Sequence, residues 1–174
     1  MPGGCDTQSP PQPQANVASP AALPEEPAVI TRSQRGKPAP AVSFRAPDGK
    51  PVTLEAFKGT PVLVNLWATW CGPCIKEMPS LDRLAMRSRG TLKVLTVSQD
   101  TDGMTTVAPW WAPRQFRAIE PYLDPEAALG FAFDSGTLPT TVLFDADGKE
   151  VWRLVGGLDW EGARAKALLS EIGG

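Results

Sequence analysis

The sequence predicts one α/β domain at residues 38–174, preceded by a linker at residues 1–37. The apolar run at residues 62–67 is rich in β-branched and aromatic side chains, which is typical of a buried strand. Helical spacing of apolar residues begins at Ile75, and strand-like and helix-like segments then alternate along the chain. With 174 residues, of which 42% are hydrophobic, the chain can bury one sizeable core.

The first 40 residues have the composition of a linker. They hold almost half of the 19 prolines of the chain, and Ala, Gln, Ser and Glu make up most of the remainder, without hydrophobic periodicity. Such a segment buries too little apolar surface to offset the entropy lost on ordering, so we expect a disordered or extended tether.

The segment at residues 41–57 is expected to form a β-hairpin. Two alternating runs, at residues 42–46 and 52–54, flank an Asp-Gly pair that favours a tight turn. A helix is then predicted at residues 72–88, with a kink at Pro79, because proline removes a helix hydrogen bond. The predicted apolar face of this helix holds Ile75, Met78, Leu81, Leu84 and Ala85.

The second half of the chain continues the alternation of strands and helices. The predicted elements are a strand at 92–97, a helix at 104–118 interrupted by prolines, a strand at 122–124, a helix at 125–131 that begins with Pro125, strands at 142–144 and 151–155, and a helix at 160–172. Asp159 is the predicted N-cap of the last helix. The predicted inner face of that helix holds Ala163, Ala167, Leu168 and Ile172.

Two adjacent tryptophans, Trp110 and Trp111, fall within the interrupted helix. They could line a groove for a client protein, although aromatic side chains in such a segment more often belong to the core. Both interpretations stay open from the sequence.

A Cys-Gly-Pro-Cys motif, from Cys71 to Cys74, lies where the predicted strand passes into the predicted helix. Two cysteines in one turn can close a disulfide, and a helix N-terminus lowers the pKa of a cysteine from ~8.5 to ~3.5–7.5. We therefore expect thiol–disulfide exchange, with Cys71 as the solvent-facing attacking thiolate and a buried Cys74 as the thiol that resolves the mixed disulfide. Gly72 and Pro73 lie between them, and Pro73 suits the first turn of a helix.

Other uses of a cysteine pair fit the chain less well. A structural zinc ion needs about four Cys or His ligands, and a copper-carrying metallochaperone would pair its cysteines with a histidine. The chain has no histidine, and its third cysteine is the distant Cys5. A purely structural disulfide would restrain only a short loop. A binding module with an inert disulfide stays open as a further alternative.

Composition restricts the partners. The net charge is −2 and no basic run stands out, so nucleic-acid binding is not expected. No apolar stretch approaches the ~20 residues of a membrane span, and the first four residues lack the basic and apolar regions of a signal peptide. We expect no cofactor and no metal, and a monomer.

The residues around the motif resemble a known family. Residues 67–74 are similar to the active-site signature of thioredoxins. Asn65, Glu77 with the Met-Pro pair that follows it, and residues 136–141 resemble the extracytoplasmic TlpA/ResA/DsbE-like branch of that superfamily. The resemblance covers about residues 38–174. It implies a thioredoxin-like three-layer α/β/α sandwich with a mixed central sheet, an N-terminal hairpin and an inserted strand–helix element.

The resemblance also implies roles for several residues. Glu77 would accept the proton of Cys74, the alternative being a solvated carboxylate near the helix start. Asn65 stands where cytoplasmic thioredoxins usually carry a buried Asp. Pro139 would follow a cis peptide bond beside the cysteines, leaving the Leu138 backbone free to pair with an extended client; otherwise it merely begins a strand.

Trp70 would be a partly exposed shield beside the site. The Gly-Pro pair between the cysteines is that of thioredoxins, whereas many members of the extracytoplasmic branch carry other residues there. This departure leaves the client and the redox poise open.

The function implied by the resemblance is reduction of protein disulfides outside the cytoplasm, in the periplasm or its equivalent. Clients in that branch include apocytochrome c and proteins of cytochrome oxidase assembly, and electrons come from a membrane thiol-transfer protein. Cys5 follows two glycines, as at the acylated cysteine of a bacterial lipoprotein, although it could be an incidental tail cysteine. A general cytoplasmic thioredoxin-type reductase is the alternative if Cys5 is not acylated and no signal precedes it.

Overall fold

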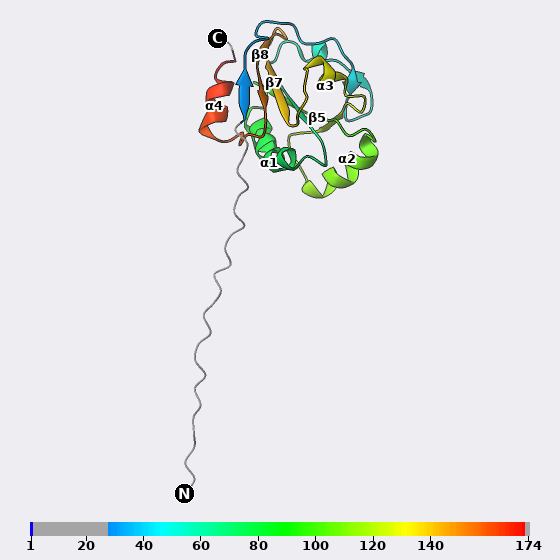
Figure 1. Cartoon of the computed structure of the whole chain (residues 1–174), viewed down its shortest axis with the longest axis vertical. Coiled ribbons are helices and arrows are strands. Elements are labelled where there is room, and N and C mark those ends of the chain that lie inside the picture. Colours follow the sequence, from blue (N-terminus) through cyan, green and yellow to red (C-terminus); the bar gives the residue numbers. More distant parts are fainter. Residues whose placement is uncertain (2–27, 173–174) are drawn as a thin grey trace.

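The computed structural model describes Met1 and residues 28–172, and within them eight strands form one mixed sheet in the order β1-β8-β7-β4-β5-β6-β2-β3 (Figure 1). The strands are β1 (Val29–Thr31), β2 (Phe44–Arg45), β3 (Pro51–Val52), β4 (Val62–Trp67), β5 (Lys93–Ser98), β6 (Pro121–Leu123), β7 (Thr140–Phe144) and β8 (Glu150–Val155). The helices are α1 (Gly72–Arg87), α2 (Met104–Trp111), α3 (Ala128–Ala132) and α4 (Ala163–Leu169), with 3-10 turns η1 (Leu54–Phe57) and η2 (Ala112–Arg114).

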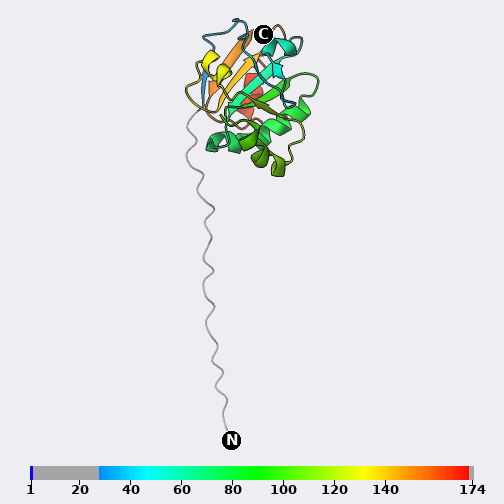
Figure 2. The same ribbon diagram turned by 90° about the vertical axis from the view of Figure 1, so that its right-hand side faces the viewer.

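Helices cover both faces of the sheet. Figure 1 shows α4 and α3 on opposite sides of the strands, and in the view of Figure 2 α3 lies in front of the sheet while α4 is seen behind it. One apolar core lies under α1 and α4 and includes Met78 and Leu168. A second core lies under α3 and includes Leu129. The predicted α/β sandwich of thioredoxin type is therefore confirmed.

The central strand β4 positions the cysteine motif. All six of its residues are buried, as its apolar sequence predicts. It pairs in parallel with β5 and antiparallel with β7, so that Asn65 lies between Thr96 and Thr141. The strand passes through a short loop into α1, and the predicted helix and hairpin are both present, the hairpin with shorter strands.

The predicted boundary between linker and domain is wrong. Val29–Thr31 form β1, which pairs antiparallel with β8 at the edge of the sheet, so the domain begins near residue 28. The β-branched side chains of this short segment favour a strand, but its proline-rich surroundings obscured the pattern. Residues 2–27 of the predicted linker, Cys5 among them, lie outside the described residues.

The helix predicted at residues 125–131 is displaced. Helix α3 begins at Ala128, preceded by Ala127 in the left-handed region with φ 53°. The Asp124 carboxylate accepts hydrogen bonds from the backbone N–H groups of Ala128 and Leu129, both at 2.9 Å. Asp124 therefore satisfies the free donors of this helix from outside it, and Pro125 does not lie in the helix.

The prediction for the last helix is wrong in its start and in part of its face: Leu168 is buried as predicted, whereas Ala163 and Ala167 are not. Helix α4 begins at Ala163, and its N-cap is Gly162 rather than Asp159. The Asp159 carboxylate instead accepts the backbone N–H of Glu161 at 3.1 Å, which stabilises a turn before the helix. Trp160 lies in this turn and is fully buried. The buried residues of α4 are Ala165 and Leu168, whereas Ala163 and Ala167 are exposed.

The two adjacent tryptophans pack mainly against other aromatic rings. Their ring centroids lie 4.8 Å (Trp110) and 5.8 Å (Trp111) from that of the buried Trp67. Helix α2 ends at Trp111 rather than extending to residue 118, because η2 follows it and Gln115 has a left-handed φ of 49°. The contacts favour the core interpretation over the client groove.

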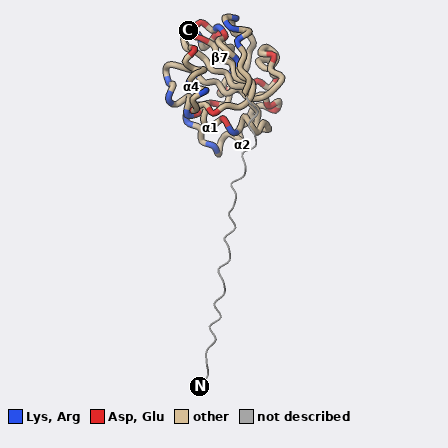
Figure 3. Tube along the Cα trace, turned by 60° about the vertical axis from the view of Figure 1, so that its left-hand side comes forward, with Lys and Arg blue, Asp and Glu red and all other residues tan. Residues whose placement is uncertain are grey.

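Charged residues of both signs are interspersed along the described chain (Figure 3). Ion pairs such as Arg83–Glu161, at 2.6 Å, lie at the surface, where each contributes little to stability. Among the described residues, no helix has the length and apolarity needed to span a bilayer, and no cluster of three or more His, Cys, Asp or Glu side chains is placed to hold a metal ion.

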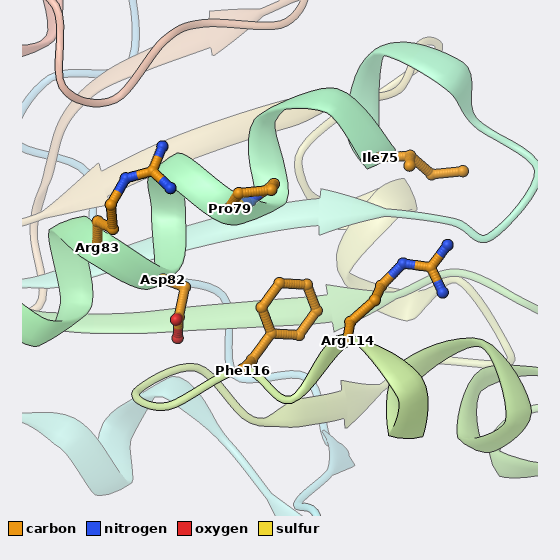
Figure 4. A pocket seen from close by; sticks show the side chains of 6 residues that line it. All are labelled: Ile75, Pro79, Asp82, Arg83, Arg114 and Phe116. Atoms are coloured by element: carbon orange, nitrogen blue, oxygen red, sulfur yellow. The ribbon is translucent and has the colours of Figure 1, made fainter.

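Asp82 of α1 joins this helix to the segment that precedes β6 (Figure 4). Its carboxylate accepts the backbone N–H groups of Arg117 (3.0 Å), Ala118 (2.7 Å) and Ile119 (3.1 Å). Two of these donors are only partly buried, so water can replace the carboxylate there, but the N–H of Ile119 is buried. We expect Asp82→Ala to lower the free energy of unfolding by about 2 kcal/mol, measured by guanidinium titration.

The matched control is Asp102→Ala, which removes an exposed carboxylate from a loop. It should change the free energy of unfolding by less than about 0.5 kcal/mol. Equal stability losses in the two variants would contradict the structural role assigned to Asp82.

Candidate active site

The two cysteines of the motif form a disulfide at the start of α1. The S–S distance is 2.01 Å, and Cys71 is the N-cap residue of the helix, with φ −90° and ψ 103°. The backbone N–H of Cys74 donates to the Cys71 Sγ at 3.3 Å, and Pro73 lies in the first turn. The Cys71 sulfur thus occupies the position where the helix dipole and a free N–H favour negative charge.

The prediction that Cys71 faces solvent is wrong for the disulfide form. Only 5% of its surface is exposed, and Cys74 is fully buried. The Cys71 sulfur is bonded to that of Cys74, and both side chains belong to the apolar core beneath α1. Trp70, the residue directly before Cys71, is 72% exposed.

The loop that carries Trp70 is held by Asp100, a residue that sequence reasoning missed. The buried Asp100 carboxylate accepts hydrogen bonds from the backbone N–H and the hydroxyl of Thr69, at 2.9 and 2.7 Å. It also accepts the Ser98 hydroxyl at 2.7 Å. Asp100 follows β5, the parallel neighbour of β4, so the two strand ends meet at the same edge of the sheet.

Glu77 lies one turn after Cys74 in α1 and is 4% exposed, so the solvated alternative is excluded. Its Oε1 accepts the Asn65 side-chain amide at 2.7 Å. Its Oε2 accepts the backbone N–H of Leu158 at 3.0 Å and the indole N–H of Trp160 at 3.1 Å. Three donors, one from β4 and two from the connection between β8 and α4, therefore converge on one buried carboxylate.

Burial raises the pKa of Glu77 to about 7, and the three N–H donors act in the opposite direction because they favour the charged form. This carboxyl group can therefore both hold and release a proton near neutral pH. The Asn65 amide also donates to Thr141 Oγ1 at 2.9 Å, while its own Oδ1 has no partner among the described residues.

A groove of about 520 Å³ opens beside the disulfide, and Glu77 is part of its wall. We call it the Glu77 groove; its lining includes Pro73, Leu138, Pro139 and Leu158. The Leu138–Pro139 peptide bond is cis, and the Pro139 carbonyl accepts the backbone N–H of Gly156 at 2.9 Å. The structure thus brings together the predicted residues at the cysteines, at Glu77 and at Pro139.

Sequence reasoning missed Leu158 and Trp160. Leu158 contributes a backbone N–H, which every residue except proline has, so its sequence gives no signal. Trp160 lies within the helix predicted at residues 160–172, which hid its role. The only local signal was a large aromatic residue directly after a turn-forming Asp.

Comparison with known proteins agrees with this geometry. The family model described as Redoxin matches residues 34–169, more than half of the sequence. The chain belongs to the Redoxin family. A curated relative, the thiol-disulfide oxidoreductase ResA of Bacillus cereus, is 34% identical over 128 residues, an alignment that covers 72% of each protein.

Solved structures share the fold. A Chlorobium tepidum protein assigned as the thiol:disulfide interchange protein DsbE has a TM-score of 0.71 and 23% identity, covering 80% of this chain and 98% of that one. The pneumococcal exposed lipoprotein thioredoxin of Streptococcus pneumoniae has a TM-score of 0.65 and 24% identity, covering 74% of this chain and 98% of that one.

This redoxin is a ResA/DsbE/TlpA-like thiol-disulfide oxidoreductase of the thioredoxin superfamily. Its cysteine pair, Cys71 and Cys74, is placed for disulfide redox chemistry, and the family indicates substrates that contain disulfides.

Proposed function

We propose that this redoxin reduces disulfides in protein clients outside the cytoplasm, with Cys71 as the attacking thiolate. The observation that carries the proposal is the Cys71 sulfur at the N-cap of α1, with the backbone N–H of Cys74 3.3 Å away. Anionic sulfur is favoured at that position and nowhere deeper in the helix.

The reaction transfers two electrons from the cysteine pair to the client. In the reduced protein the Cys71 thiolate attacks a client disulfide, forms an S–S bond with one client sulfur and releases the other as a thiolate. Cys74 then loses its proton and attacks the Cys71 sulfur. The Cys71–Cys74 disulfide forms, and the second client sulfur leaves as a thiolate.

Glu77 is the proposed acceptor of the Cys74 proton. It follows Cys74 by three residues on the same helix, which places the two side chains as neighbours on one face. Its pKa of about 7 leaves a substantial carboxylate fraction at neutral pH. Asn65, Gly72 and Pro73 support the site by holding the carboxylate and shaping the turn.

The client would bind over the Glu77 groove. Leu138 and Pro139 line the groove, and Trp70, directly before Cys71 in the chain, offers an exposed apolar surface. An extended client segment that pairs with the Leu138 backbone would bring its disulfide to Cys71.

A location outside the cytoplasm is supported by the similarity to a pneumococcal exposed lipoprotein thioredoxin. In this proposal Cys5 is the lipid anchor, the residues from Cys5 to residue 27 are the tether, and residues 28–174 are the catalytic domain. A membrane thiol-transfer protein supplies electrons. Proteins of cytochrome c or cytochrome oxidase maturation are the proposed clients, and the protein acts as a monomer without a cofactor.

The test is a trap for clients in the native host. Cys74→Ser leaves the attack of Cys71 possible and prevents resolution, so mixed disulfides should accumulate on Cys71. Non-reducing gels and mass spectrometry of the adducts measure this outcome and identify the clients. Cytoplasmic adducts alone would overturn the proposed location.

The matched control is the double variant Cys71→Ser with Cys74→Ser, which should give no adducts. Adducts of equal yield in the double variant would show that capture does not depend on Cys71, and would overturn its proposed role.

A further inference from the structure

Residues 156–160, in the connection between β8 and α4, pack against the active site. A Cβ atom added at Gly157 would lie 3.6 Å from the Cβ of Pro73, so this segment closely approaches the cysteine turn. The backbone of Gly156 is hydrogen-bonded to Pro139 at 2.9 Å. The next residues, Leu158 and Trp160, deliver the two N–H groups that reach Glu77 Oε2.

We propose that Trp160 is a positioning residue, which together with the backbone N–H of Leu158 orients the Glu77 carboxylate and stabilises its charged form. The inference deepens the proposed function and rests on it for the role of Glu77 in catalysis. The orientation and titration of Glu77, however, can be measured independently of catalysis.

Several contacts fix the Trp160 indole before any client binds. The side chain is fully buried, and its ring stacks on that of Trp152 with centroids 6.5 Å apart and an interplanar angle of 15°. The backbone N–H of Trp160 donates to the Ser80 hydroxyl at 3.1 Å, and that hydroxyl donates to the Glu77 carbonyl at 2.8 Å. Trp160 is therefore tied to the α1 turn that carries Glu77 through both its backbone and its indole.

The groups around Glu77 that could also act on its charge come from α1 and from the β8–α4 connection. Lys76 and Arg83 of α1 line the groove, as does Asp159 of the connection, and Arg83 pairs with Glu161 at 2.6 Å.

The neighbouring strands contribute only uncharged side chains to this carboxylate, Asn65 from β4 and, through it, Thr141 from β7. Reduction of the disulfide adds the thiols of Cys71 and Cys74. Neutral N–H donors therefore make the direct contacts that favour the carboxylate form.

The experiment compares Trp160→Phe with Trp152→Phe. Both substitutions shorten a fully buried tryptophan of the same stacked pair, but the Trp152 indole donates to the Leu168 carbonyl, at 3.0 Å, and not to Glu77. Glu77 is titrated in the oxidised full-length protein by NMR of ¹³C-carboxyl-labelled glutamate. The Glu77→Gln variant assigns its resonance.

Loss of one of three donors should raise the midpoint of the Glu77 titration by about one pH unit, a tenfold change in its ionisation constant. Trp152→Phe should leave the midpoint close to that of the wild type. An unchanged midpoint in Trp160→Phe, or an equal rise in Trp152→Phe, would overturn the inference.

Two further measurements keep the result decisive. Circular dichroism shows whether Trp160→Phe folds. If it does not, Leu158→Pro is used, because it removes the second N–H donor and should also raise the midpoint of the Glu77 titration. An unchanged midpoint in Leu158→Pro would then overturn the inference. The pH dependence of disulfide reduction is then measured in the folded variant. If the midpoint of the Glu77 titration shifts but the pH dependence of the reduction rate does not, Trp160 remains a positioning residue, but the proposed proton-accepting role of Glu77 is refuted.

Discussion

Cys71→Ser is expected to reduce the turnover of disulfide substrates to the rate seen without protein, because the variant lacks the sulfur that attacks. The measurement is reduction of insulin disulfides by dithiothreitol, followed by the turbidity of the released chains. Cys5→Ser provides the matched control, since it removes the cysteine outside the motif, and it should retain full activity.

The two cysteines of the motif are expected to differ in whether their serine variants form a mixed disulfide with the substrate. Cys74→Ser should also fail to turn over, but it should form one stable mixed disulfide with the substrate, whereas Cys71→Ser should form none. Turnover by Cys71→Ser at a rate near that of the wild type would contradict the assignment of the nucleophile.

Glu77→Gln is expected to change both the pH dependence of stability and the rate of reduction. Because burial raises the Glu77 pKa from 4.5 to about 7, the folded protein binds this proton more tightly than the unfolded chain does. The stabilisation by the neutral carboxyl is complete below pH 4.5 and is lost as the pH rises through about 7. The wild type should therefore lose about 3 kcal/mol of folding free energy over this range that Glu77→Gln does not lose.

Glutamine can occupy the site with few other changes. Its oxygen can still accept the N–H groups of Leu158 and Trp160, and its amide can donate to Asn65 Oδ1 if the Asn65 side chain turns over. Asn65 Oδ1 has no hydrogen-bond partner among residues 28–172, so rotation of the Asn65 amide would give this oxygen a donor. Guanidinium titrations of the oxidised protein at acidic and at mildly alkaline pH measure the difference.

The rate of disulfide reduction by Glu77→Gln near neutral pH should fall by about tenfold or more, because no group remains to accept the Cys74 proton. The rise of the rate through pH ~7 should disappear with it. Glu161→Gln, at a surface ion pair, is the control and should leave the profile unchanged. A Glu77→Gln variant with the wild-type profile would assign Glu77 to a structural role only.

The sequence was most informative where local pattern and tertiary environment agree. The apolar run of β4 lies in the centre of the sheet, where both faces are covered, so its composition alone predicts a buried strand. The position of the cysteines at the start of α1 is predicted because the strand-like apolar run before them gives way to helical spacing of apolar residues after them.

The sequence failed where distant contacts decide the structure. Asp159, just before a segment with helical spacing of apolar residues, matches an N-cap in sequence. In the structure the Trp160 ring is instead buried in the core, and its indole N–H donates to Glu77. Helix α4 accordingly starts at Ala163. Likewise, the exposure of Cys71 was predicted from the helix terminus alone, without the neighbouring core that covers it in the disulfide form.

Asn65 combines both situations. Its departure from the thioredoxin pattern is visible in the sequence, and it directs attention to Glu77 as the replacement for the acid that is absent at position 65. The direct hydrogen bond from Asn65 on β4 to Glu77 on α1 depends on how the helix packs on the sheet, which the sequence pattern does not specify.

The central claim, that Cys71 is the activated thiolate, is tested most directly by the alkylation rate of each thiol as a function of pH. Two reduced variants are compared, each retaining one cysteine of the motif and lacking Cys5. The helix terminus predicts that Cys71 is alkylated much faster than Cys74, and that its reactivity rises at a lower pH. If Cys74 is instead the faster thiol and becomes reactive at the lower pH, both the helix-terminus argument and the assignment of roles are wrong.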